Sequence, residues 1–269
     1  MKKYEDFSGS IDTIIEEYSN FNEFCSIQDS RTPTPWAVDH GQAREAYDSY
    51  WRRCESFGQA QDFLLHGFDE DVKEMVGRVK TLQKQGTRMR TRRYADVTGF
   101  QPIVQNAILG LPNSMMNSKK TPVNNKVVTI MYNPSVSAST DKGTVMKFGS
   151  ELLSHIMNLE KNGFRVKLEY ACPFLNGKHL YVLRIPIKNE NNPLNIKRVS
   201  FPIAHVGMFR YLAFDWYERL PKSEYMSRYG DVFTHAPMSV QKKFKSLLND
   251  NEYMIQLGDD LEYIFGSIK

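Results

Sequence analysis

The chain has 269 residues, of which 41% are hydrophobic and 25% are charged, and its formal net charge is +4. This composition excludes an intrinsically disordered chain, because there are enough apolar residues to build a core. Every apolar run is shorter than the roughly 18 to 20 residues that span a bilayer, and the polar start MKKYEDFSGS lacks the apolar segment of a signal peptide. We therefore expect a folded protein of the cytoplasm that does not contact a membrane.

The three cysteines do not indicate a disulfide framework or a zinc knuckle. Cys25, Cys54 and Cys172 are widely spaced, odd in number and form no CxxC pair. We expect all three to be buried or half-buried thiols.

Residues 1–85 are predicted to form a helical N-terminal region with an arm. In IDTIIEEYSNFNEF, residues 11–24, apolar side chains recur at helical spacing, which predicts a first helix. Pro33 and Pro35 then break this pattern. We therefore expect residues 28–41 to form an arm that lies on another surface.

Two more helices are predicted before residue 86. Ser56 is suited to cap the first of them, Gly67 to end it, and Asp69 to open the second. The apolar residues of the second helix recur on one face, which indicates that it packs against a core.

Residues 86–125 are predicted to be a basic, irregular connector laid over the core. The connector begins with GTRMRTRRYADVTG and has one short helix at residues 103–109. Its closely spaced arginines are Arg88, Arg90, Arg92 and Arg93. Three interpretations of them stay open: a solvated face, a strip that contacts the phosphates of a nucleic acid, and a docking surface for an acidic partner.

Residues 126–269 are predicted to be an α/β domain. The run VVTIMY is typical of a strand buried on both faces, as in a parallel sheet. A helix at residues 144–161 follows, and the strands FRVKLEYA and HLYVLRIPI come next, so a βαβ unit is expected. A helical segment at residues 195–219, a helix at residues 240–248 and a last strand, EYMIQL, complete a three-layer open sheet.

The turn NPSVSAS directly follows the first strand of this domain. Its Asn133, Ser135 and Ser137 resemble the D-x-S-x-S cation site of von Willebrand factor A domains, with asparagine in place of aspartate. The resemblance covers residues 127–187, and it implies a sheet of von Willebrand A type and a Mg²⁺ or Ca²⁺ ion beside Ser135 and Ser137. Asparagine supplies only a neutral oxygen, which lowers the affinity for a hard cation.

The alternative to a metal site is a structural turn, in which the serine hydroxyls bond the neighbouring backbone. Open α/β sheets usually bind ligands in a crevice at such strand ends. The predicted binding crevice consists of Asn133, Ser135, Ser137 and Thr140.

A wider part of the chain resembles an uncharacterised protein family of tailed bacteriophages and prophages. The resemblance is carried by GFQPIVQNAILGLPNSMMN, NPSVSAS, LEKNGFRVKLEYA and LNIKRVSFPIAHVGMFRYLAFDWYE. In the first stretch the matching positions are Gly99, Pro102, Gly110, Pro112 and Met115. The resemblance implies a phage origin and a place in the host cytoplasm or the virion, and it names no activity.

No catalytic residue is assigned from the sequence. There is no P-loop, no GxGxxG and no G-x-S-x-G, and His155, His205 and His235 have no nucleophile or metal-spaced partner nearby. Asp259 and Asp260 follow the last strand, where α/β enzymes do place carboxylates, but GDD also forms an ordinary turn. We therefore expect no enzyme.

Two functions follow as hypotheses. The favoured one is a phage-encoded, non-enzymatic protein-interaction or assembly module that uses the crevice at the strand end. The alternative is a nucleic-acid-binding protein that uses the strip from Arg88 to Arg93, as a subunit of a larger phage complex. A metal-dependent enzyme or adhesion module is the third.

Overall fold

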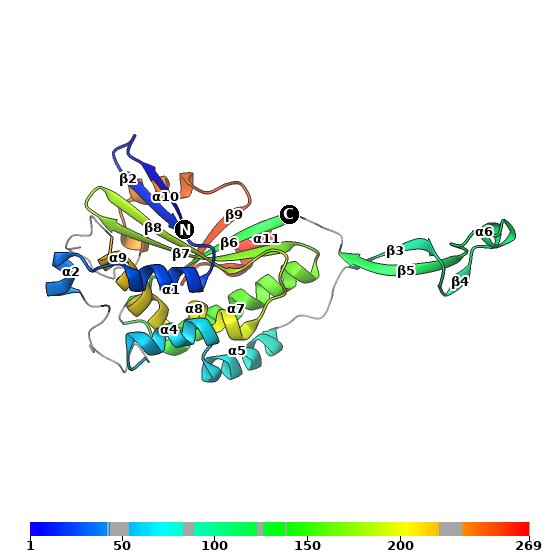
Figure 1. Cartoon of the computed structure of the whole chain (residues 1–269), viewed down its shortest axis with the longest axis horizontal. Coiled ribbons are helices and arrows are strands. Elements are labelled where there is room, and N and C mark those ends of the chain that lie inside the picture. Colours follow the sequence, from blue (N-terminus) through cyan, green and yellow to red (C-terminus); the bar gives the residue numbers. More distant parts are fainter. Residues whose placement is uncertain are drawn as a thin grey trace.

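A six-stranded mixed sheet forms the centre of the protein (Figure 1). The computed structural model describes residues 1–41, 43, 54–82, 89–122, 126–137, 139–220 and 233–268. The strands lie in the order β1-β2-β8-β7-β6-β9. Their bounds are β1 Lys2–Asp6, β2 Asp12–Glu17, β6 Val127–Asn133, β7 Arg165–Asn176, β8 His179–Lys188 and β9 Glu252–Gln256.

The predicted βαβ unit is confirmed. Strand β6 is parallel to both of its neighbours, β7 and β9, while β8 runs antiparallel to β7. Helix α7 (Lys142–Lys161) connects β6 to β7. The Asp141 carboxylate caps α7 by accepting a hydrogen bond from the Thr144 N–H at 2.9 Å. Gly163, just after the helix, has a φ of 93°, a left-handed conformation that favours glycine.

Strand residues alternate between two cores, one on each face of the sheet. Ile130 and Tyr132 of β6 pack against the helices of one face, whereas Met131 packs against the opposite face. On β8, Tyr181 and Val182 divide in the same way. The mixed α/β fold class is therefore present.

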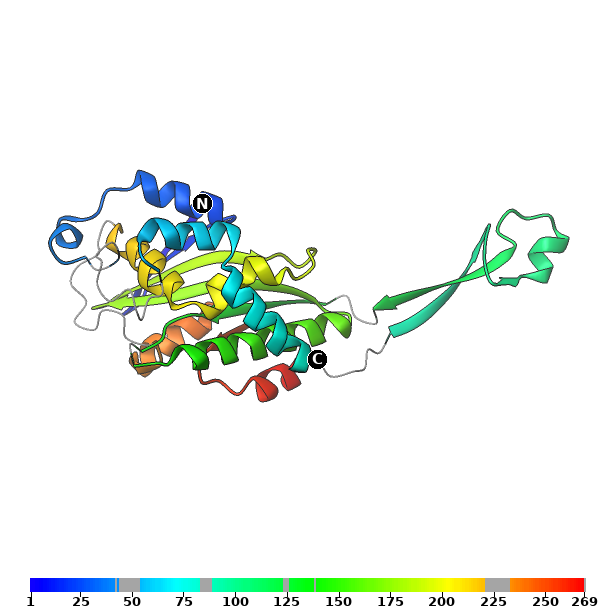
Figure 2. The ribbon, with the colours of Figure 1, turned by 90° about the horizontal axis from the view of Figure 1, so that it is seen from below.

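Helices cover the two faces unequally (Figure 2). One face holds α1 Phe21–Ser30, α4 Phe57–His66, α5 Asp69–Leu82, α7, α8 Ile196–Ala204, the π-helix η1 Met208–Ala213, α9 Phe214–Glu218 and α11 Leu261–Ser267. The other face holds α10 Met238–Ser246 and the single turn η2 Phe233–His235. Within the described residues, no helix combines the length and the apolar character needed to cross a membrane.

The helix predicted for residues 11–24 is wrong in its first half. Residues 12–17 form β2, which pairs with β8 in the main sheet, and only residues from Phe21 onward are helical. Ile14 packs on one face of the sheet and Ile15 on the other, so the pattern has the period of a strand. The two helices predicted after it, α4 and α5, are confirmed.

The segment predicted to lie as an arm on another surface contacts the end of α9. Helix α2 (Pro35–His40) lies within it, capped by Thr34. The Thr34 backbone N–H donates to the Glu218 carbonyl at 3.2 Å. Residue 42 and residues 44–53 lie outside the described part of the chain.

The prediction of an irregular connector is wrong for residues 89–122, which form a three-stranded antiparallel sheet, β3-β5-β4. Figures 1 and 2 show this segment, called the projection below, extending far beyond the body of the protein. Its elements are β3 Met89–Asp96, β4 Gln101–Pro102, α6 Val104–Ile108 and β5 Met115–Pro122. Only the short helix was predicted; the pairing of β3 with β5 was not.

Candidate functional site

The turn at the end of β6 is closed by the chain's own hydrogen bonds. The side-chain oxygen Oδ1 of Asn133 accepts a bond from the Ser135 N–H at 3.1 Å, and its side-chain Nδ2 donates to Oε1 of Gln256 at 3.3 Å. The Ser135 hydroxyl accepts a bond from the Phe233 N–H at 3.4 Å. Asn133 and Ser135 are both buried, so they do not offer the open contact surface that the sequence led us to expect.

The outer part of this turn is less enclosed. Ser137 and Thr140 are half-buried, and the Ser137 hydroxyl bonds the hydroxyl of Ser139 at 3.0 Å. On the inner side, Arg210 of η1 donates to the Val136 carbonyl at 3.1 Å. These contacts match the alternative of a structural turn.

The residues of this turn do not fit a bound divalent cation. A hard cation needs several free oxygen ligands, preferably carboxylates. Here the amide oxygen of Asn133 is neutral, and the oxygens of Asn133, Ser135 and Ser137 already accept or share hydrogen bonds. Nor do His, Cys, Asp and Glu side chains anywhere in the described part of the chain form a group of three or more suited to hold a metal.

The predicted arginine strip lies on the projection. Arg90, Arg92 and Arg93 belong to β3, whereas Arg88 lies outside the described residues. In the antiparallel register, Arg92 is opposite Lys119 and Thr91 is opposite Lys120 of β5. The structure therefore adds two lysines to the strip. We call Arg90, Arg92, Arg93, Lys119 and Lys120 the basic band.

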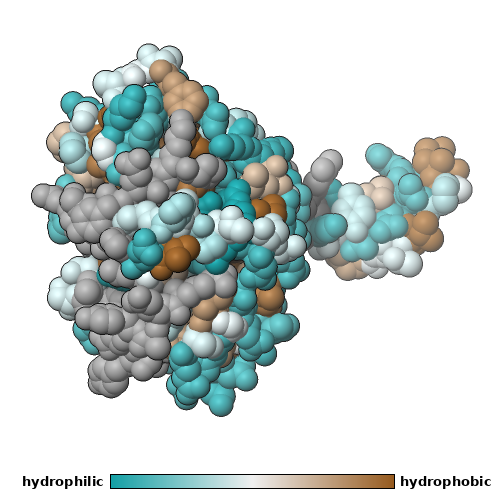
Figure 3. Space-filling model, turned by 60° about the vertical axis from the view of Figure 1, so that its left-hand side comes forward, coloured by the Kyte–Doolittle hydropathy of each residue, from teal (hydrophilic) through white to brown (hydrophobic). Residues whose placement is uncertain are grey.

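The far end of the projection exposes a concentrated set of apolar side chains. Between Asp96 and Lys119 the sequence has no charged residue, and we call residues 97–114 the apolar tip. Ile108 is 79% exposed and Leu109 is 72% exposed. The other exposed large hydrophobic residues of the tip are Val97, Phe100, Val104 and Leu111. Figure 3 shows these hydrophobic surfaces gathered at the end of the projection.

The apolar tip has a defined backbone. The Phe100 N–H donates to the Met116 carbonyl at 2.9 Å, and the Ile103 N–H donates to the Ser114 carbonyl at 2.7 Å. The Asn106 side chain bonds the Asn113 carbonyl at 2.9 Å. These bonds order the backbone that carries the exposed side chains, which lowers the backbone entropy lost when a partner binds.

Two glycines of the tip are required by its geometry. A Cβ at Gly99 would collide with the carbonyl of Met116, where the two chain segments cross. Gly110 has a φ of 68°, which favours glycine. Sequence reasoning read these glycines as signs of irregular structure and missed the tip; the uncharged run was the signal that could have found it.

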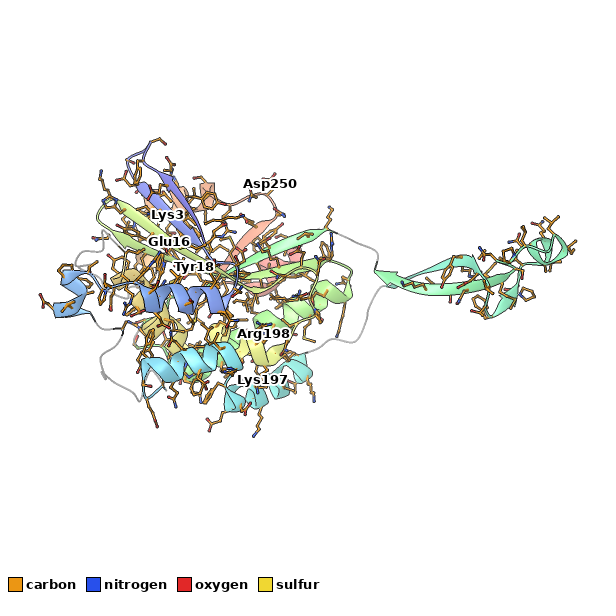
Figure 4. All side chains as sticks on the ribbon, viewed as in Figure 1. Lys3, Glu16, Tyr18, Lys197, Arg198 and Asp250 are labelled. Carbon is orange, nitrogen blue, oxygen red and sulfur yellow. The ribbon has the colours of Figure 1, made fainter. Side chains whose placement is uncertain are left out.

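A buried ionic cluster of the body surrounds Glu16 (Figure 4). Its carboxylate accepts hydrogen bonds from Tyr18 at 2.8 Å, from Trp216 at 2.8 Å and from Arg31 at 2.9 and 3.0 Å. Burial raises the pKa of Glu16, but the bonds from Arg31 and Trp216 outweigh it and lower that pKa below its ordinary value. Every one of these hydrogen bonds to Glu16 comes from a residue of the chain itself. The cluster therefore joins β2 to α9, and the Glu16 carboxylate is not free to act as a base.

The remaining candidates from the sequence have structural contacts. His155 stacks on Phe265 with ring centroids 4.8 Å apart, and His205 accepts a bond from the Gly207 N–H at 3.0 Å. Asp259 accepts a bond from the Gln256 N–H at 2.9 Å, and Asp260 caps α11. Burial raises the pKa of Asp259. The two carboxylates thus shape the turn after β9.

The comparisons with known proteins yield one family. No curated protein matches the chain, and no solved structure matches it. A family model described as "Domain of unknown function (DUF7192)" matches residues 4–263. The matched range begins in β1 and ends in α11, so it includes the main sheet except the first two residues of β1, the turn after β6 and the projection. The chain therefore belongs to the DUF7192 family.

Proposed function

We propose that this chain is a non-enzymatic interaction and assembly module that docks on a protein partner through the apolar tip. One observation carries the proposal: of the large hydrophobic side chains that are exposed in the described residues, seven lie between Tyr94 and Leu111. Such a concentration of exposed apolar surface is characteristic of binding sites. The tip replaces the strand-end crevice as the contact surface, because Asn133 and Ser135 are buried.

A protein is the class of partner that suits this tip. Protein interfaces have apolar cores in which a few large side chains supply most of the binding energy, with few charges among them. The tip offers Phe100, Ile108 and Leu109 without any charged residue between Asp96 and Lys119. The ordered backbone of the tip also favours the binding of a protein, because little backbone conformational freedom remains to be lost on binding.

We also propose that the sheet is of von Willebrand A type and that the protein acts in a phage or prophage, in the host cytoplasm or the virion. The order of β6, turn, α7, β7 and β8 supports the fold type. The setting rests on the resemblance of sequence alone. A metal-dependent adhesion function is not part of the proposal, because the turn after β6 does not fit a cation.

The test compares partners recovered with tagged full-length variants from the cells that carry the protein, after nuclease treatment. The tip variant is Ile108→Asp with Leu109→Asp; the control is Val38→Asp, which is 71% exposed on α2. We expect one defined protein to accompany the wild type and the control and to be lost from the tip variant. Purified partner and chain should then bind directly, with an affinity that falls about a hundredfold or more in the tip variant.

Equal recovery of that protein with the tip variant would show that the tip is not the contact surface. Self-association is a separate outcome, detected by sedimentation velocity of the purified chain. A wild-type oligomer that becomes a monomer in the tip variant would make a second copy the partner. Circular dichroism of each variant checks that its fold is kept.

A further inference from the structure

The net charge of the protein lies on the projection. Strands β3 (MRTRRYAD) and β5 (MMNSKKTP) contain three arginines, two lysines and one aspartate. The whole chain has 35 Lys and Arg and 31 Asp and Glu, so 30 basic and 30 acidic residues remain outside these two strands. The formal charge of +4 therefore equals the charge of strands β3 and β5, called the ribbon below. The rest of the chain carries equal numbers of basic and acidic residues.

The basic band is compact because of the strand register. Arg90 is opposite Thr121 and Arg93 is opposite Ser118, so the five basic residues belong to four adjacent levels of the ribbon, where a level is one pair of directly opposite residues. Four levels extend over roughly 10 Å at the spacing of antiparallel strands. Double-stranded DNA presents about six phosphates along that length of its axis. Successive residues of a strand alternate between its two faces, so Arg90, Arg92 and Lys119 lie on one face of the ribbon and Arg93 and Lys120 on the other. Counted over both faces, the density of positive charge on the band is close to the density of negative charge on a duplex.

The described charges of the band are free to meet an external anion. Arg93 and Lys119 are exposed, and neither has an ion pair among the described residues. In the body, the less exposed cations Arg31, Arg184 and Lys188 each pair with a carboxylate. Unpaired cations on an otherwise balanced protein indicate a polyanionic ligand.

We propose that the basic band binds the phosphate backbone of double-stranded DNA. A two-stranded β-ribbon fits the major groove of B-form DNA, whereas the major groove of duplex RNA is too narrow for it. The projection presents such a ribbon far from the body, so the body does not obstruct a duplex (Figure 1). This activity uses different residues from the apolar tip, and it goes beyond the proposed protein docking.

The test measures binding of the purified full chain by fluorescence anisotropy to a DNA duplex of about 20 base pairs, the matching single strand and the matching RNA duplex. We expect the DNA duplex to bind most tightly. Its affinity should fall a few hundredfold between about 50 and 200 mM salt, as expected for about five released counterions.

The band variant is Arg93→Glu with Lys119→Glu. The matched control makes the same change of charge on α8, with Lys197→Glu and Arg198→Glu, both exposed and labelled in Figure 4. We expect the band variant to lose at least about tenfold in affinity for the DNA duplex and to depend less steeply on salt, while the control binds like the wild type. A second band variant, with glutamine at both positions, should weaken binding less.

Three results would overturn the proposal: no binding to the duplex at low salt, equal loss in the band variant and the control, or equal binding of the single strand and the RNA. The tip variant Ile108→Asp with Leu109→Asp separates this proposal from the docking proposal, because it should keep its affinity for DNA. Loss of protein docking in this variant with DNA binding intact would support both proposals, and loss of both activities would overturn the assignment of DNA binding to the basic band.

Discussion

At the scale of single residues, the buried carboxylate of Glu16 connects parts of the chain that are far apart in sequence. It lies in the second strand of the fold, yet it accepts a hydrogen bond from Trp216 and a two-point contact from Arg31. A carboxylate taken out of water is stable only when such partners satisfy it. No local pattern around residue 16 shows that Trp216 will be its partner.

We expect Glu16→Gln to lower the free energy of unfolding by about 3 kcal/mol near neutral pH, because Arg31 then loses its buried counter-charge. The pKa of Glu16 is lowered in the folded protein. The contribution of the Glu16 charge to the free energy of unfolding is therefore complete above the ordinary pKa of a glutamate. It is lost as the pH falls through the lowered pKa of Glu16. Urea unfolding at several pH values should show a gap between wild type and variant that closes in acid.

The control for this substitution is Glu5→Gln on β1. Glu5 forms an ion pair with Lys3, and both side chains are exposed. An exposed pair contributes little, so this variant should unfold almost like the wild type at every pH. A gap for Glu16→Gln that stays constant into acid would show that packing, and not charge, is what the substitution removes.

At the scale of elements, the projection is the part of the fold that supplies no core residue. Each of the hydrophobic clusters in the described residues is built from the main sheet, its covering helices and the segments beside them, and none includes a residue of 89–122. The ribbon is held by the pairing of β3 with β5 and by the bonds of the tip. Its folding and that of the body should therefore be nearly independent.

We expect the body to keep its stability when residues 97–114 are replaced by Asn-Gly. Asp96 and Met115 are directly opposite one another, so a two-residue turn can join the strands. The melting temperature should change by no more than about 2 °C, since no buried apolar contact of the body is lost. Calorimetry measures it, and a much larger drop would show that the tip packs on the body.

At the scale of the whole molecule, Arg184 ties four strands of the sheet together. Its guanidinium lies 3.1 Å from Glu17 of β2, 2.6 Å from Glu169 of β7 and 3.0 Å from Glu252 of β9. Burial raises the pKa of Glu169, but Arg184 and Lys167 together outweigh it and lower that pKa. This cluster lies across the sheet, so it depends on the strand order as a whole.

We expect Arg184→Met to lower the free energy of unfolding by about 3 kcal/mol near neutral pH, because three carboxylates then lose the guanidinium that they share and, among the described residues, only Glu169 keeps another cation, Lys167. The pKa of Glu169, which Arg184 lowers, should rise in the variant, so protonation of Glu169 relieves the repulsion and the loss should shrink in mildly acidic buffer. Denaturant unfolding at both pH values measures this. A loss that grows in acid would contradict the electrostatic explanation.

The sequence by itself determined the elements whose pattern is local. The buried strand β6, the amphipathic helix α7 and the βαβ unit followed from apolar periodicity and from the helix-ending Gly163. Helices α4 and α5 followed from Ser56, Gly67 and the apolar face of the second helix. These signals are readable because neighbouring residues form each hydrogen bond and each face.

Only the tertiary structure decided the features that depend on distant partners. Residues 11–24 show a helical spacing of apolar side chains, yet pairing with β8, encoded more than a hundred residues later, made residues 12–17 a strand. Asn133 and Ser135 matched a binding motif, yet Gln256 and Phe233 occupy their polar atoms. The arginines of β3 became part of a larger band only through the register with β5. In each case the deciding contact is long-range, and a local pattern does not encode it.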